Sequence, residues 1–153
     1  MTTLTQQALS KLAGIFAREV PFNRVLGLEF QTLDPEKCVL SFKMKDELVG
    51  NFVTGVLHGG VISAALDMAG GTMAAVSVMH ANPITHITEL GRKLARLSTI
   101  DIRVDYLQPG RGEVYFATAT MLRTGSRVAV VRMELRNETD TLIAVATGTY
   151  MVA

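Results

Sequence analysis

The chain has 153 residues, 48% of them hydrophobic and 19% charged, and its formal net charge is +1. This length fits one domain, so we expect residues 1–153 to form a single unit. The apolar content exceeds what a small domain needs for its own core, which predicts buried subunit contacts, an apolar ligand pocket, or both. Because the chain has no block of Lys and Arg and no Trp, we expect neither nucleic acid nor a membrane as its partner.

The N-terminal segment has the pattern of an amphipathic helix. Ala8, Leu12 and Phe16 recur at helical spacing, which predicts a helix over about residues 5–18 that ends before Pro21. No basic stretch precedes a clean apolar run, so we expect no export signal and a cytoplasmic protein.

Two strands and a long apolar helix follow. Residues 28–34 and 37–45 have strand patterns and are joined by a short turn. A loop over 46–57, rich in glycine and small polar residues, leads into an apolar helix over about 60–79. This run carries Asp67 and several glycine or serine positions, so we interpret it as a buried helix and not as a membrane span.

The C-terminal half changes to a period of two, which predicts antiparallel strands. After a short charged helical pattern at 87–97, strand patterns occupy 99–108, 113–123, 127–137 and 141–152. The order of elements indicates an α+β fold in which the apolar helix covers one face of the sheet. Because this helix is apolar nearly all round, it has to be enclosed on every side, and one sheet wraps only part of it.

The segment 99–108 presents two different faces. An apolar set alternates with a polar one; the apolar set is Ile100, Ile102, Val104 and Tyr106, and the polar set is Thr99, Asp101, Arg103 and Asp105. We expect the charged members of the polar set to be solvated or to form ion pairs, with a subunit contact as the functional alternative.

The sequence His58-Gly59-Gly60 stands at the start of the apolar helix. Two glycines there leave backbone N–H groups unobstructed at the positive end of the helix dipole. This arrangement favours an oxyanion hole or another anion site. The simpler alternative is that the glycines only allow a tight entry into the helix.

Asp67 lies between Leu66 and Met68, and no Lys or Arg occurs from 53 to 81. We expect poor solvation of this carboxylate, which is costly for a charged group without a partner. Such an acid is a candidate nucleophile or general base. Alternatively, its side chain reaches Ser63 or a neighbouring strand and serves packing alone.

The spacing of the two candidate groups constrains the assembly. Gly60 and Asp67 are separated by about 10 Å along a helix that rises about 1.5 Å per residue. A reacting carbonyl must lie roughly 3 Å from both the oxyanion donor and the attacking group. If both act in one reaction, a second copy of the chain must supply one of them, as in a two-fold homodimer.

The pattern HGGVISAALDMAGG, followed by TIDIRVDYLQPGRGE, RTGSRVAVVRMEL and ATGTYMV, resembles the hotdog-fold acyl-CoA thioesterases of the PaaI-like group. Within that group it is especially similar to the YigI-type medium- and long-chain enzymes. The resemblance implies an antiparallel sheet around a long central helix, with an N-terminal helix and a small helical insertion before the third strand. It also implies an acyl-CoA substrate and a homodimer or dimer of dimers with active sites at the subunit interface.

Matched position by position, the resemblance implies roles for four residues. The Gly59 amide would polarise the thioester carbonyl. Asp67 of the neighbouring subunit would be the nucleophile or the general base that activates water. His58 would orient the loop or the substrate, and Thr99 would help position the attacking water.

Contacts with coenzyme A are implied for Gly60 and for a turn late in the chain. The residues of that turn are Arg123, Gly125, Ser126 and Arg127.

Two features depart from the family pattern. The catalytic-loop Asn of the group usually lies six residues before the His, where this chain has Phe52; Asn51, seven residues before, is therefore the candidate. The connection around 86–98 is longer than usual, and we expect it to cap the acyl pocket.

We expect no metal and no cofactor, because coenzyme A is part of the substrate. We interpret His80 and His86 as two loop histidines and not as metal ligands, and the single Cys38 excludes a cysteine-based zinc site and an internal disulfide. The predicted function is hydrolysis of medium- or long-chain acyl-CoA, with aromatic acyl groups as a further option. The alternatives are a non-catalytic acyl-CoA-binding module and a hotdog-fold enoyl-thioester hydratase.

Overall fold

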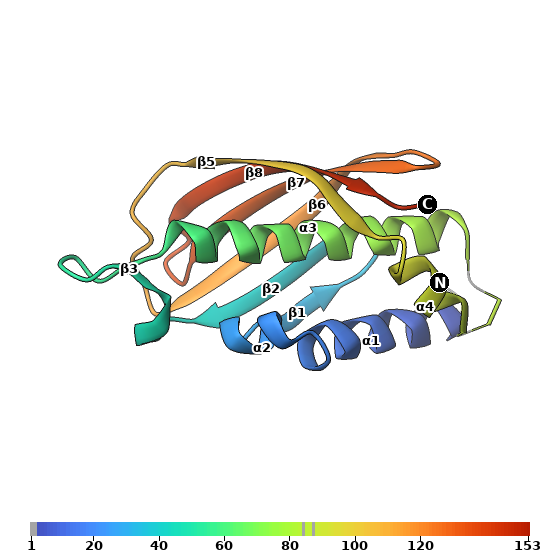
Figure 1. Ribbon diagram of the computed structural model, residues 1–153, viewed down its shortest axis with the longest axis horizontal. Helices are drawn as coiled ribbons and strands as arrows, with labels where there is room; N and C mark the ends of the chain where they lie inside the picture. Colours follow the sequence, from blue (N-terminus) through green and yellow to red (C-terminus); the bar gives the residue numbers. More distant parts are fainter. Residues whose placement is uncertain (1–2, 84, 87) are drawn as a thin grey trace.

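The computed structural model describes residues 3–83, 85–86 and 88–153. Its centre is a six-stranded antiparallel sheet in the order β1-β2-β6-β7-β8-β5, curved around the long helix α3 (Figure 1). The α+β class and the antiparallel sheet around a central helix, both expected from the sequence, are confirmed.

The elements have the following bounds. The sheet consists of β1 (Glu29–Leu33), β2 (Lys37–Lys43), β5 (Ser98–Tyr106), β6 (Val114–Thr124), β7 (Val128–Asn137) and β8 (Leu142–Met151). The helices are α1 (Thr3–Arg18), α2 (Pro21–Leu26), α3 (Gly59–Ala81) and α4 (Thr88–Leu94). The helix predicted at 87–97 is thus shorter at its C-terminal end, and residue 87 lies outside the described residues.

Helix α2 was not predicted. We interpreted Pro21 as a signal that ends the first helix, but proline is also favoured at the first position of a new helix because its missing N–H is not needed there. Val20 is extended before it, and Gly27 closes α2 in the left-handed region at φ 72°, donating to the carbonyls of Asn23 and Arg24. A second, short helix therefore follows α1 directly in the chain.

The predicted loop over 46–57 is partly ordered into regular structure. A 3-10 turn, Asp46–Leu48, leads into a small separate hairpin formed by β3 (Val49–Asn51) and β4 (Val56–Leu57). This hairpin leads directly into α3, so it fixes the chain just before the helix begins (Figure 1).

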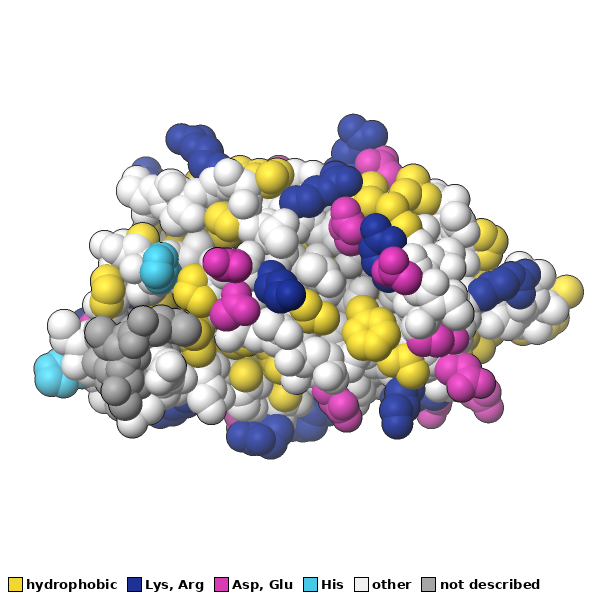
Figure 2. Space-filling view, turned by 180° about the vertical axis from the view of Figure 1, so that it is seen from behind, with side chains coloured by type: hydrophobic (Ala, Val, Ile, Leu, Met, Phe, Trp, Pro, Cys, Tyr) yellow, Lys and Arg dark blue, Asp and Glu magenta, His cyan; other side chains and the backbone are white. Residues whose placement is uncertain are grey.

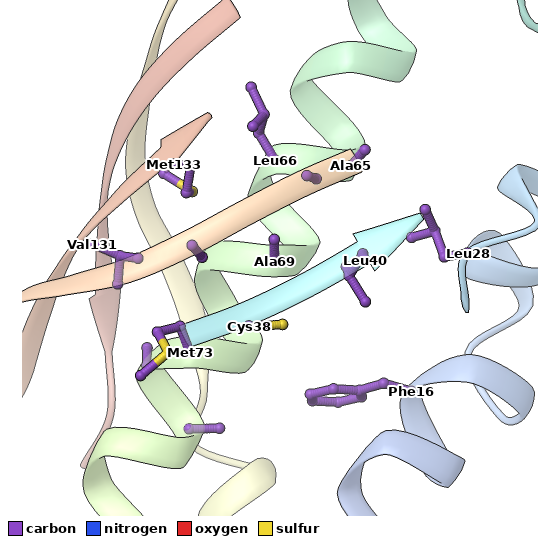
Figure 3. Packing of buried hydrophobic residues seen from close by; sticks show 14 of the residues in the cluster. Phe16, Leu28, Cys38, Leu40, Ala65, Leu66, Ala69, Met73, Val131 and Met133 are labelled. Atoms are coloured by element: carbon purple, nitrogen blue, oxygen red, sulfur yellow. The ribbon is translucent and has the colours of Figure 1, made fainter. Parts of the chain in front are cut away.

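The core lies between α3 and the inner face of the sheet. Ala69 and Met73 of α3 belong to the same buried cluster as Leu40 of β2 and Met133 of β7, and Phe16 of α1 also contributes to it (Figure 3). Burial alternates along β7, as a strand with one face on the core requires. Each large apolar side chain buried in this way contributes about 1.5–3 kcal/mol.

Helix α3 is long and apolar enough to cross a membrane by length and composition, but 61% of its most apolar window is buried inside the fold. The helix is therefore the core helix, as the Asp and Gly residues within it predicted. One stripe remains partly exposed: Val61, Ala64, Asp67 and Met68 are all half-buried. The sheet thus covers only part of α3. On the face seen from behind, acidic and basic side chains are interspersed with apolar ones (Figure 2).

Candidate functional site

The entry into α3 leaves one backbone amide available. His58 is the N-cap, and its Nδ1 accepts a hydrogen bond of 2.8 Å from the amide of Gly60. Among the residues that the structure describes, the Gly59 amide has no acceptor. Because the first amides of a helix carry its partial positive charge, the Gly59 N–H is the donor that remains for an anionic oxygen. The Gly60 amide, by contrast, is already engaged.

Asp67 lies two turns further along α3 and is half-buried. The hydroxyl of Thr99 on β5 donates to its carboxylate, at 3.0 Å from Oδ1 and 3.3 Å from Oδ2. The hydroxyl of Tyr150 on β8 lies 3.1 Å from Oδ1. The carboxylate is thus held by neighbouring strands, which was one of the alternatives left open by the sequence, and it is better satisfied than we expected.

A β-bulge brings Thr99 to Asp67. The β5–β8 register runs Thr99 opposite Tyr150 and then Asp101 opposite Thr149, so one residue, Ile100, is extra on β5. An extra residue interrupts the alternation of faces and redirects the side chains before it. Strict alternation predicted that Thr99 shares the outer face with Asp101. Because of the bulge it does not, and Ile100 is 50% exposed instead of buried.

Of the predicted polar face, Arg103 and Asp105 form an exposed ion pair of 3.0 Å.

Tyr150 is 1% exposed and its ring lies against two glycines. A Cβ at Gly70 would stand 2.2 Å from the Tyr150 oxygen, and a Cβ at Gly148 would stand 2.8 Å from it. Burial and then the charge of Asp67 raise the pKa of the Tyr150 hydroxyl well above its usual range. The hydroxyl is therefore a neutral donor at physiological pH.

An apolar pocket opens beside Asp67. Its volume is about 370 Å³, and Asp67, Thr99 and Tyr150 form part of its wall. The remaining wall is mostly apolar and comes from the N-terminal helices, α3 and the segment after α4; it includes Phe16, Val20, Phe22, Met68, Leu94 and Leu97. Ligand pockets in proteins typically have a volume of at least about 300 Å³ and a largely apolar wall with a few polar groups.

Asn51 lies at the turn of the β3–β4 hairpin, where its Oδ1 accepts from the amides of Val53 and Thr54. Phe52, at the position where the family pattern has Asn, is 93% exposed. The structure gives Asn51 a turn-forming contact, and its predicted catalytic role remains a prediction.

The predicted coenzyme A turn connects β6 and β7. Arg123, Ser126 and Arg127 are exposed there, and the Gly125 amide closes the turn by donating to the Val128 carbonyl at 2.9 Å. Ser126 also lines a surface pocket of about 470 Å³ to which α4 and the residues after it contribute three basic side chains, Arg92, Lys93 and Arg96. Glu89 and Ala153 line the same pocket.

Other candidates for chemistry do not gather into a site. Burial raises the pKa of the Cys38 thiol to about 12, so this cysteine is protonated and inert as a nucleophile. Within residues 3–83, 85–86 and 88–153, no three His, Cys, Asp or Glu side chains are grouped so that they could hold a metal ion.

Tyr150 is a residue of the site that the sequence alone did not indicate. The available signal was the strand pattern Gly148-Thr149-Tyr150, in which a glycine stands two residues before a tyrosine on the same face, together with Gly70 and Gly71 in the helix. Glycines at these positions indicate that a large side chain packs closely there, but not which acid its hydroxyl reaches.

Comparisons with known proteins show the family to which the chain is related. The family model described as the thioesterase superfamily matches residues 54–144, a range that includes the α3 entry, Asp67 and Thr99. Over 147 residues the chain is 46% identical to the medium/long-chain acyl-CoA thioesterase YigI of Escherichia coli strain K12, covering 96% of this chain and 95% of that protein. The corresponding protein of Salmonella typhimurium is 45% identical over the same length.

Solved structures show the same architecture. A Shewanella oneidensis protein related to the thioesterase superfamily superimposes with a TM-score of 0.95 at 42% identity, over the full length of both chains. Thioesterase superfamily member 2 of zebra fish has a TM-score of 0.73 at 23% identity, covering 95% of this chain and 98% of that one, a similarity that supports the fold alone.

Proposed function

The chain belongs to the thioesterase superfamily, and we propose that it hydrolyses acyl-CoA to a free acid and coenzyme A with Asp67 as its central catalytic group. One observation supports this most directly: the Asp67 carboxylate, oriented by two hydroxyl groups, forms part of the wall of an apolar pocket. This is the arrangement that a reaction at an acyl carbonyl requires, with a nucleophile or base next to a site for the acyl group.

In the proposed mechanism two groups of α3 act on the thioester: the Gly59 amide at the start of the helix and the Asp67 carboxylate two turns later. The Gly59 amide donates to the carbonyl oxygen as negative charge develops on it. Asp67 either attacks the carbonyl carbon or removes a proton from the attacking water, and Thr99 helps to position that water. When water attacks, the C–S bond then breaks, coenzyme A leaves as a thiolate, and the acid is released. When Asp67 attacks, coenzyme A leaves in the same way, and water then hydrolyses the acyl–Asp67 anhydride to release the acid and restore the carboxylate. His58 supports the step by holding the helix entry through Gly60.

The two groups are too far apart to act together within one subunit. Eight residues of helix separate Gly59 from Asp67, about 12 Å at 1.5 Å per residue. We therefore propose a two-fold dimer in which the Gly59 of one copy faces the Asp67 of the other.

The free edge of the sheet supports that assembly. Strand β5 lies at the end of the strand order and offers nine residues, of which Ile100 and Tyr106 are each at least half exposed. A long edge strand with exposed apolar side chains is a template for pairing with another strand. Pairing of two β5 strands would also bring the partly exposed stripe of α3 against its counterpart.

The pocket beside Asp67 supports a medium- or long-chain acyl group. Most of its wall is apolar, and α1, α2 and the segment after α4 contribute Phe16, Phe22 and Leu97. The insertion around 86–98 thus forms part of the pocket wall, which supports its expected role as a cap. The nucleotide and phosphates of coenzyme A are assigned to Gly60 and the β6–β7 turn, where Arg123 and Arg127 are exposed.

The test is release of free thiol from short, medium, long and aromatic acyl-CoAs, with the wild-type protein and Asp67→Asn side by side. We expect the highest turnover with medium or long chains and a loss of about 10²-fold or more in kcat for Asp67→Asn with an unchanged fold. Binding without thiol release would instead indicate an acyl-CoA-binding module. Water addition to an enoyl-CoA would indicate a hydratase.

A further inference from the structure

Tyr150 is the buried residue whose side chain reaches the reactive carboxylate from the strand next to β5. Its hydroxyl oxygen lies 3.1 Å from Asp67 Oδ1, 3.3 Å from the Asp67 carbonyl oxygen and 3.6 Å from the Met133 sulfur. A hydroxyl has one proton to donate. The carboxylate is both the nearest and the only charged of these acceptors, and hydrogen bonds to charged acceptors are the stronger ones.

We propose that Tyr150 is a positioning residue for catalysis: its hydroxyl fixes Asp67 Oδ1, so that Oδ2 is the oxygen that attacks the thioester or activates water. The inference rests on the proposed function of Asp67.

The hydrogen-bond pattern distinguishes the two carboxylate oxygens. Oδ1 receives the Tyr150 hydroxyl at 3.1 Å and has the shorter contact with Thr99, 3.0 Å. Within the part of the chain that the structure describes, Oδ2 has only the longer contact with Thr99, 3.3 Å. Because donors occupy the lone pairs of one oxygen and fix the plane of the group, the oxygen with fewer donors is the one available for reaction.

The packing around Tyr150 makes it a rigid support. The side chain is 1% exposed, and its hydroxyl occupies space that a Cβ on Gly70 or Gly148 would fill. A side chain held by close packing keeps its hydroxyl in place without loss of conformational entropy during the reaction. The hydroxyl also stays protonated over the range in which a thioesterase works, because burial raises the pKa of Tyr150.

The test compares Tyr150→Phe with Tyr115→Phe. Tyr115 is a suitable control because it is also fully buried and its hydroxyl also makes internal hydrogen bonds, to the carbonyls of Gly110 at 3.1 Å and Gly112 at 3.0 Å, away from Asp67. Both variants lose a buried hydroxyl and keep the ring. We expect kcat of Tyr150→Phe to fall about tenfold to a hundredfold, the effect of removing one hydrogen bond to a charged group, with KM within about twofold of wild type.

Tyr115→Phe should keep kcat near the wild-type value while losing a similar amount of thermal stability. If Tyr150→Phe kept full kcat while Asp67→Asn lost activity, the role of Tyr150 would be refuted and the proposed function would stand. If Asp67→Asn also kept full turnover, the proposed function itself would fail. Equal losses of kcat in both Phe variants would show a general effect of destabilisation and would also refute the inference.

Discussion

Thr99 lies directly opposite Tyr150 in the β5–β8 register, and the hydroxyls of both residues contact the carboxylate of Asp67. The bulge at Ile100 sets this relationship, because it places Thr99 on the side of the strand that faces α3. The cross-strand pair Thr99 and Tyr150 thus holds the Asp67 side chain of α3. The register of the sheet therefore fixes the position of the proposed catalytic carboxylate.

The first prediction concerns the coupling of the two hydroxyls. Thr99→Val removes one donor and keeps the branched shape, so we expect kcat to fall by about tenfold. Because both hydroxyls orient the same carboxylate, the double variant with Tyr150→Phe should lose less than the product of the single losses. Steady-state kinetics of the four proteins measure this coupling, and strictly multiplicative losses would show that the two hydroxyls act independently.

The second prediction tests the Gly59 amide. Gly59→Pro removes the N–H at the first position of α3, where proline is tolerated and where His58 is already extended at ψ 134°. We expect kcat to fall about 10²–10³-fold, the cost of losing one oxyanion donor. Gly59→Ala keeps the amide and serves as the control, since its Cβ would be 3.4 Å from the nearest Tyr106 atom. Equal activity of the two variants would rule out a role for this amide.

The third prediction concerns the glycine under Tyr150. In Gly70→Ala the new Cβ would meet the Tyr150 oxygen at 2.2 Å and the Met133 sulfur at 2.4 Å. Overpacking costs about 1–3 kcal/mol, which outweighs the gain of about 1 kcal/mol in helix propensity. The free energy of unfolding should therefore decrease, as urea denaturation at fixed protein concentration can measure.

Gly91→Ala is the matched control for that experiment. Gly91 also lies within a helix, but nothing is within 4 Å of its added Cβ, so the variant should be stabilised by up to about 1 kcal/mol. If Gly70→Ala were instead more stable than the wild-type protein, Tyr150 and Met133 would not pack closely against Gly70.

The fourth prediction concerns chain length. Ala64 lies on α3 and lines the pocket beside Asp67. Ala64→Leu adds volume to the pocket wall, so we expect the ratio of long-chain to short-chain kcat/KM to fall, with short-chain turnover largely kept. Thiol release across the acyl-CoA series measures this ratio. An unchanged ratio would show that the acyl chain does not bind in the pocket beside Asp67.

The central elements of the fold could be predicted from the sequence because their signals are local. The apolar run that becomes α3 and the alternation in β7 follow from periodicity alone. The start of α3 near His58-Gly59-Gly60 could also be predicted, because the apolar run begins directly after these residues. Helix α2 was missed because Pro21 is compatible with both the end of one helix and the start of the next.

The support of Asp67 could not be predicted because it depends on tertiary structure. Tyr150 is 83 residues from Asp67 in the sequence, and no local pattern joins them. Thr99 was implied by family resemblance, but its contact depends on a bulge, which is decided by strand register in the folded sheet. The sequence therefore indicated Asp67 and, through the resemblance, Thr99, but it predicted neither the contact between these two residues nor the role of Tyr150.

The most direct test of the account is complementation between two inactive subunits. Co-expression of Asp67→Asn with Gly59→Pro chains in equal amounts gives half heterodimers by random pairing, and each heterodimer has one site with both native groups if the site is shared. We predict that each variant alone is inactive in thiol release and that the mixture regains about a quarter of wild-type activity, since one of two sites is intact in half of the dimers. A mixture that forms heterodimers and remains inactive would contradict a catalytic site that combines Gly59 of one subunit with Asp67 of the other.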